Sequence, residues 1–154
     1  MESSSGLPLD QYTKAVPPGW KPNLYWYTFR RFIERLRLWY RVTDLAPESI
    51  GPAIAGRLQG RPYNFAMTMA ITMRDGTHLT GDAALAYVGE PEHPTGTGGM
   101  LPAIESGPQQ LVRILQRKFG IHDQDLVGKV IDEFIDLTWQ IVSLGVLQRV
   151  RVSL

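Results

Sequence analysis

Three histidines and one run of glycines are the residues of this chain that could form a metal-binding or a phosphate-binding site. His78, His93 and His122 all fall in predicted loops, and no two of them stand four residues apart on one predicted helix. Zinc sites built on a helix use that spacing, so the histidine pattern predicts no metal site. The chain has no cysteine, which excludes a thiol nucleophile, a disulfide scaffold and every cysteine-containing zinc site.

The glycine run Gly96-Thr97-Gly98-Gly99 invites comparison with phosphate-binding loops. Such a loop follows a strand, opens a helix and is often followed by a lysine with a serine or threonine. Here Met100-Leu101-Pro102 follow the glycines, and no strand is predicted before them. We therefore interpret residues 89–99 as a long, flexible Gly/Pro loop.

The carboxylates Asp132, Glu133 and Asp136 stand together on a predicted helix. Acid–base catalysis by paired carboxylates needs one of them buried, with a raised pKa, and the pattern favours a solvated face instead. No G-x-S-x-G motif marks a serine nucleophile. The sequence thus predicts no catalytic residue, no metal ion, no cofactor and no small-molecule substrate, and an unfamiliar enzyme site remains one alternative.

Charge is distributed unevenly although the whole chain has a net charge of only +1. Residues 21–41 hold six basic residues against one acid, net +5, whereas residues 77–106 hold four acids and no lysine or arginine. The helix predicted within the basic segment places one polar face opposite its apolar stripe, and we take this as the candidate assembly face: Arg30, Glu34, Arg37 and Arg41. Glu34 is expected to pair with Arg30 and Arg37. The candidate nucleic-acid contacts are Lys21, Arg30, Arg31, Arg37 and Arg41.

The elements that must position these residues are read from apolar spacing. Steps of three and four predict a helix over 24–41, with Asn23 as its N-cap, and further helices follow. The second helix follows the loop Thr43–Glu48 with Pro47 in its first turn, or begins near Pro52 because Gly51-Pro52 interrupts its apolar stripe. The others begin at Arg61-Pro62, at Ser106 and after His122, with one short turn near Gly81. Gly60 is expected to end the second helix, the apolar third is expected to be buried and to run to Asp75-Gly76, and residues 139–154 are ambiguous between helix and strand. The predicted core includes Trp20, Phe29, Leu36, Trp39, Leu58 and Leu115.

The resulting fold class is all-α, a compact bundle of about five helices with a Pro-rich N-terminal arm and a long Gly/Pro loop. Several segments resemble the capsid region of retrotransposon Gag polyproteins. In that family an aromatic helix ends in Leu-x-x-Trp, and a later helix gives Ala-x-x-Leu-x-Gly. Here Leu36 and Trp39 match the first motif, and Ala55, Leu58 and Gly60 match the second. The later stretches that look similar are Gly81–Leu85, Gln110–Leu115, Phe119-Gly120 and Ile131–Phe134.

The resemblance implies a self-assembling structural module that is not an enzyme. It divides the chain into a flexible Pro-rich arm (1–22), a helical capsid-like domain (23–120), and a final helix with an irregular tail (121–154). This last part is expected to correspond to a truncated second capsid domain. The expected partner is a second copy of the chain, with RNA as a further candidate and no membrane. The alternatives are an RNA- or DNA-binding module using the basic helix, and a small enzyme. The expected location is intracellular, cytoplasmic or nuclear.

Overall fold

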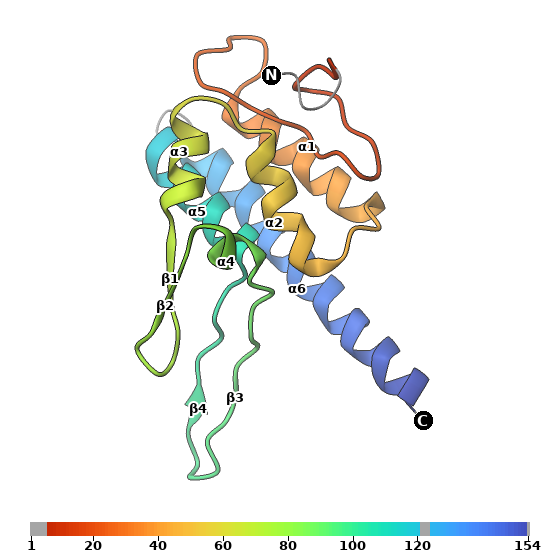
Figure 1. Cartoon of the computed structure of the whole chain (residues 1–154), viewed down its shortest axis with the longest axis vertical. Helices are drawn as coiled ribbons and strands as arrows, with labels where there is room; N and C mark the ends of the chain where they lie inside the picture. Colours follow the sequence, from red (N-terminus) through yellow and green to blue (C-terminus); the bar gives the residue numbers. More distant parts are fainter. Residues whose placement is uncertain (1–5, 121–123, 154) are drawn as a thin grey trace.

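The computed structural model describes residues 6–120 and 124–153, apart from the side chains of 124–126 and 142–153. The described part is rich in helix, as the sequence predicts, and also contains two small antiparallel hairpins (Figure 1). The helices are α1 (Phe29–Val42), α2 (Pro47–Gly56), α3 (Arg61–Thr68), α4 (Gly81–Ala86), α5 (Gly107–Phe119) and α6 (Gln124–Ser153). The strands are β1 (Ala70–Thr72), β2 (His78–Thr80), β3 (His93–Pro94) and β4 (Met100–Leu101).

Helix α1 is the central amphipathic element, and it begins later than predicted. Thr28 is its N-cap, because its hydroxyl accepts a hydrogen bond from the Arg31 amide at 3.3 Å. The predicted N-cap, Asn23, is wrong: it has a positive φ of 70° in the turn that precedes the helix. The buried face of α1 packs against α6.

The core forms between α1, α2, α5 and the first half of α6, and the structure confirms burial of all six predicted core residues. Trp20 enters this core from the N-terminal arm, where its indole meets the rings of Phe29 at 5.3 Å and Phe119 at 5.4 Å. Its Nε1 donates to the Tyr27 carbonyl at 3.0 Å, so the indole is satisfied inside the core.

The N-terminal arm packs on the helical body, and its hydrogen bonds to Arg57 were not predicted from the sequence. Arg57, only 7% exposed, donates hydrogen bonds from all three guanidinium nitrogens to four arm carbonyls. Trp20 also forms a backbone bridge to Leu58, next to that arginine. Because the N–H donors of a guanidinium point in several directions within one plane, this single side chain can bind carbonyls from several parts of the arm.

Helix α2 begins at Pro47, with Glu48 in its first turn, which confirms the earlier of the two predicted starts and not the one near Pro52. Pro52 is tolerated inside the helix because its ring is exposed and the carbonyl it leaves unpaired belongs to the exposed Glu48. The opposite side of the helix meets α4, where a Cβ at Gly51 would collide with the Leu85 carbonyl. Gly60 does not end α2 as predicted: it is the N-cap of α3, with a φ of 72°.

The predicted third helix is the largest error in the fold. Helix α3 stops at Thr68, only Pro62 and Ala66 in it are buried, and the chain continues as the hairpin β1–β2. Asp75-Gly76 is the turn of that hairpin: Gly76 has a φ of 88°, and the Asp75 carboxylate accepts from the Thr77 amide at 3.0 Å. Asp-Gly is a preferred hairpin turn. The continuous apolar run before it favours a helix at the level of sequence, because a short buried strand and a buried helix share that pattern.

The Gly/Pro loop is organised as a second hairpin, a pairing that the sequence did not predict. Glu90 and Ile104 pair at its base, β3 pairs with β4 further out, and the hairpin extends away from the helices (Figure 1). Arg74 braces the base by donating to the Glu90 carboxylate at 2.7 Å and to the Pro102 carbonyl at 2.7 Å.

Helices α5 and α6 complete the body. Ser106 and Gln109 form a capping box at the start of α5, as the predicted start at Ser106 requires. The buried Gln109 amide also donates to the Thr138 hydroxyl of α6 at 2.6 Å. Of the two alternatives for the tail, helix and strand, the structure shows helix: α6 continues to Ser153, so the tail is not irregular, and its end extends beyond the other helices (Figure 1). Within the described residues, no helix is long and apolar enough to cross a lipid bilayer.

Candidate functional site

The outer face of α1 joins exposed apolar side chains to basic ones. Leu38 is 48% exposed and Val42 is 45% exposed, although both are large hydrophobic residues. They stand four residues apart, with Arg31 and Arg35 completing the same helical row and Arg41 beside it. We name these five residues the α1 patch. An apolar centre inside a charged rim is the usual composition of a protein–protein contact surface.

Three of the four residues of the predicted assembly face, Arg30, Glu34 and Arg37, lie to one side of this patch, and two of them pair with each other. The Arg30 Nε atom lies 3.5 Å from a Glu34 carboxylate oxygen, which confirms that expected pair. The expected pairing of Glu34 with Arg37 is wrong. Arg37 instead donates to Glu133 of α6 at 2.9 Å, because α6 packs along that side of α1. Only Arg41 of the predicted face belongs to the α1 patch.

The three arginines of the α1 patch keep an uncompensated charge. Among the residues that the structure describes, none of Arg31, Arg35 and Arg41 has a carboxylate within 4.0 Å. Arg30 and Arg37 are neutralised by their own helix and by α6. The positive potential of the helix therefore centres on the apolar pair, where an approaching molecule would meet it.

Two aromatic residues are exposed immediately before α1. Tyr25 is 94% exposed and Trp26 is 46% exposed, with the Trp26 ring stacked on Tyr27 at 5.6 Å. Lys21, a predicted nucleic-acid contact, is exposed in the same turn region. Exposed rings beside cations could stack on nucleobases, whereas the aromatic residues inside α1 are buried and unable to do so.

The acidic segment 77–106 has less free charge than its composition suggests. Glu90 pairs with Arg74, and Glu105 forms a two-point ion pair with Arg113 at 2.6 and 2.7 Å. The hydrogen bond to Glu105 is the largest cause of a raised pKa at Arg113. A second acidic surface lies on α6, where Asp132 and Asp136 are exposed one turn apart. The sequence placed these two carboxylates on a solvated face, which the structure confirms.

The titratable groups show no arrangement for acid–base chemistry in the described part of the chain. Burial raises the pKa of the Tyr27 and Tyr40 hydroxyls well above the ordinary value of 10.0, away from any catalytic range. The described residues contain no cluster of three metal-binding side chains. His78 lies 3.1 Å from the Thr72 hydroxyl and His93 lies 3.4 Å from Arg74, whereas the predicted loop residue His122 lies outside the described residues.

Sequence reasoning missed the apolar half of the α1 patch. The core stripe of the helix passes through Leu36 and Trp39, and Leu38 and Val42 fall outside it at a spacing of four. That offset spacing was a usable signal of a second apolar face. Arg57 was also missed, because no local pattern marks an arginine that is satisfied by carbonyls forty or more residues away.

Comparison of the chain with protein-family models, with curated proteins and with solved structures finds no significant match.

Proposed function

We propose that this chain is a non-enzymatic structural module that associates with copies of itself. The observation that carries the proposal is the α1 patch, in which Leu38 and Val42 are exposed within a rim of arginines that lack carboxylate partners among the described residues. Leaving two large apolar side chains in water is unfavourable by about 25 cal/mol per Å² of apolar area, so covering them favours association. Catalysis has no comparable support in the geometry.

Charge favours a head-to-tail contact over a symmetric one. A two-fold contact of one α1 patch with another would set Arg31, Arg35 and Arg41 against their own copies, which is repulsive. The exposed carboxylates Asp132 and Asp136 on α6 of a second copy have the opposite charge. A contact between two different surfaces leaves each copy with one free surface of each kind, so it repeats into rings or lattices.

The resemblance to Gag capsid regions supports the same proposal, because it rests on residues that build this fold. Leu36 and Trp39 of the first motif are completely buried in α1, and Ala55 and Leu58 of the second lie in the core around α2. The proposal accordingly includes a homo-oligomer that assembles inside the cell, in the cytoplasm or nucleus, with the chain corresponding to the helical capsid domain.

Sedimentation velocity over a range of protein concentrations and salt concentrations tests the proposal. We expect species larger than a monomer at low salt, and fewer of them as salt screens the arginine contacts. Leu38→Glu should return the protein to a monomer without unfolding it, because the side chain is exposed. The matched control is Val88→Glu, which changes an apolar residue of similar exposure (43%) outside α1. A wild-type monomer under all conditions would overturn the proposal.

Binding of single-stranded RNA or DNA is the second candidate, favoured by Tyr25 and Trp26 being exposed beside basic residues. The pairing of Arg30 and Arg37 removes two of the five predicted contacts, leaving Lys21, Arg31 and Arg41. Titration with a labelled oligonucleotide over a salt series separates the candidates. Binding through three phosphates predicts a slope of about −2 in a plot of log affinity against log salt. Trp26→Ala should weaken it, and should leave self-association unchanged.

A further inference from the structure

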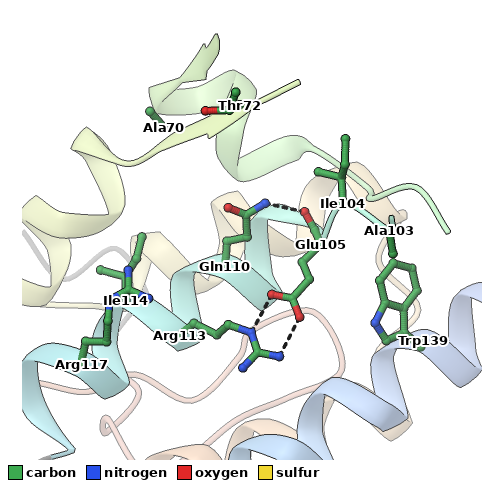
Figure 2. Close-up of a pocket in the computed structure, with 10 residues that line it drawn as sticks. All are labelled: Ala70, Thr72, Ala103, Ile104, Glu105, Gln110, Arg113, Ile114, Arg117 and Trp139. Atoms are coloured by element: carbon green, nitrogen blue, oxygen red, sulfur yellow. Dashed lines mark hydrogen bonds and ion pairs between the residues drawn. The ribbon is translucent and has the colours of Figure 1, made fainter. Parts of the chain in front are cut away.

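A groove lies between strand β1 and helix α5, in a part of the molecule that includes no residue of α1. Its volume is about 580 Å³, within the range of ligand-binding pockets. Figure 2 shows β1 along one wall, the side chains of α5 on the floor, and Trp139 of α6 at one end. All residues that line it belong to the described part of the chain.

The wall formed by β1 is an open strand edge. Met73 donates from its amide to the Thr77 carbonyl at 2.8 Å, and the Met69 carbonyl accepts from the Gly81 amide at 3.3 Å. Alternate residues of an antiparallel strand direct their backbone groups to opposite sides, so those of Ala70 and Thr72 face away from β2. Both residues line the groove, and neither has a backbone partner there among the described residues. An edge of this kind can accept another extended chain.

The floor of the groove carries two arginines, of which only Arg113 has a carboxylate partner among the described side chains. Arg113 is occupied by Glu105 through two short hydrogen bonds, and Gln110 donates to the Glu105 carbonyl at 2.7 Å. Arg117, one turn further along α5, is exposed, and no carboxylate lies within 4.0 Å of it among the side chains that the structure describes, those of residues 6–120 and 127–141. The groove therefore favours a ligand that places a carboxylate beside Arg117.

The other end of the groove is apolar. Ile104 and Trp139 are half-buried there, and Figure 2 places them across the Glu105–Arg113 pair from Arg117. In an extended peptide, every second side chain points to the same side. One such peptide along β1 can therefore present an acidic side chain to Arg117 and an apolar side chain to Trp139.

We propose that this groove binds an extended, acidic peptide segment of a partner protein, which adds a strand to the outer edge of β1. Backbone hydrogen bonds to Ala70 and Thr72 hold the segment in register. The charge of Arg117 selects a glutamate or aspartate, and the surface of Trp139 and Ile104 selects an apolar residue further along. This binding is independent of the α1 patch, so a chain that fails to self-associate can still show it.

The test uses the full chain and a dye-labelled hexapeptide of alternating valine and threonine in which one residue is glutamate. A second hexapeptide with glutamine in place of glutamate is the ligand control. We expect fluorescence polarisation to show binding of the glutamate peptide, about tenfold tighter than the glutamine peptide. Arg117→Gln should abolish that preference. Lys118→Gln, which removes a neighbouring α5 cation outside the groove, should preserve it.

The strand edge is tested separately by Ala70→Pro, which removes an amide that β2 does not use. Met69 already has φ −67° and ψ 154°, the conformation that a residue before proline prefers, so the hairpin should tolerate the change. We expect at least a tenfold loss of peptide affinity. In the wild-type protein, the Ala70 and Thr72 amide signals in NMR spectra should shift on peptide addition, which needs no variant.

Three results would overturn this proposal. One is the absence of peptide binding up to about 1 mM. Another is a peptide affinity that is the same for the glutamate and glutamine peptides and is unchanged by Arg117→Gln. The third is binding that leaves the Ala70 and Thr72 amide signals unmoved, because the peptide would then lie elsewhere.

Discussion

The Nε atom of Arg57 donates a 2.8 Å hydrogen bond to the carbonyl of Pro17, forty residues earlier in the chain. The same guanidinium reaches the carbonyls of Leu7, Pro8 and Gln11. A buried cation usually needs a carboxylate, but here carbonyl dipoles of the arm supply the compensation. This places the N-terminal arm in the folded unit and locates Trp20 over the core.

Replacing Arg57 with lysine should therefore destabilise the fold although it keeps the charge. A lysine ammonium cannot reproduce the planar fork, and several arm carbonyls would lose their donors. We expect a loss of about 2–4 kcal/mol in the free energy of unfolding, measured by urea denaturation. Limited proteolysis should begin to cleave the arm. Arg31→Lys, at an exposed position, is the control and should change stability by less than about 0.5 kcal/mol.

A second prediction compares two glycines of α2. Gly51→Ala should destabilise by about 1–3 kcal/mol, because the new Cβ collides with the backbone carbonyl of Leu85 in α4. Gly56→Ala should stabilise by roughly 0.5–1 kcal/mol, because nothing lies within 4 Å of its Cβ position and alanine has the better helix propensity. Thermal unfolding of both variants measures the difference. Equal effects would mean that α2 and α4 are further apart than the structure shows.

A third prediction concerns the ion pair between Arg37 and Glu133. Both side chains are partly exposed, at 31% and 48%, so a double-mutant cycle should give a coupling free energy below about 1 kcal/mol. Charge reversal at Arg37 should leave folding nearly intact. Self-association should respond more strongly to charge reversal at Arg41, which belongs to the α1 patch. Sedimentation of the two reversal variants ranks the positions, and the opposite ranking would place the interface on the α6 side of the helix.

A fourth prediction concerns alkaline pH. Burial raises the pKa of Tyr27 and Tyr40, and burial together with the negative charge of Glu90 raises that of Tyr87 to about 12. Because these folded-state pKa values exceed the unfolded value of 10.0, their contribution to stability is complete below pH 10 and is lost as the pH rises toward 12. The melting temperature should fall over that interval. Tyr40→Phe, which removes one of these buried hydroxyls, should make the fall shallower.

Local periodicity predicted the helical elements that have one clear apolar face. The stripe from Phe29 to Tyr40 identified α1 and its buried side, and Ser106 with Gln109 marked the start of α5. These signals are short-range, because helix spacing and capping depend on residues three or four apart. The same reasoning began α1 too early, since the aromatic residues before Thr28 continue the pattern through a turn.

Local patterns were misleading where contacts over long distances decided the conformation. The apolar run after Arg61 predicts one helix, but the helix ends at Thr68 and β1 pairs with β2 across the Asp75-Gly76 turn. The Gly/Pro loop became a hairpin because Arg74 and the Glu90–Ile104 bridge hold its base. Strand pairing of this kind depends on partners elsewhere in the fold, which side-chain spacing does not report.

The amino-acid sequence by itself determined a helix-rich fold, the six core positions, and a first helix with strong positive charge. Only the tertiary structure decided which arginines remain free, because α6 lies against Arg37 and leaves Arg31, Arg35 and Arg41 beside two exposed apolar residues. Only the tertiary structure brought β1 alongside α5 to form a groove. The physical reason is range: periodicity and capping act within a turn or two, whereas ion pairing and burial depend on which distant segments meet.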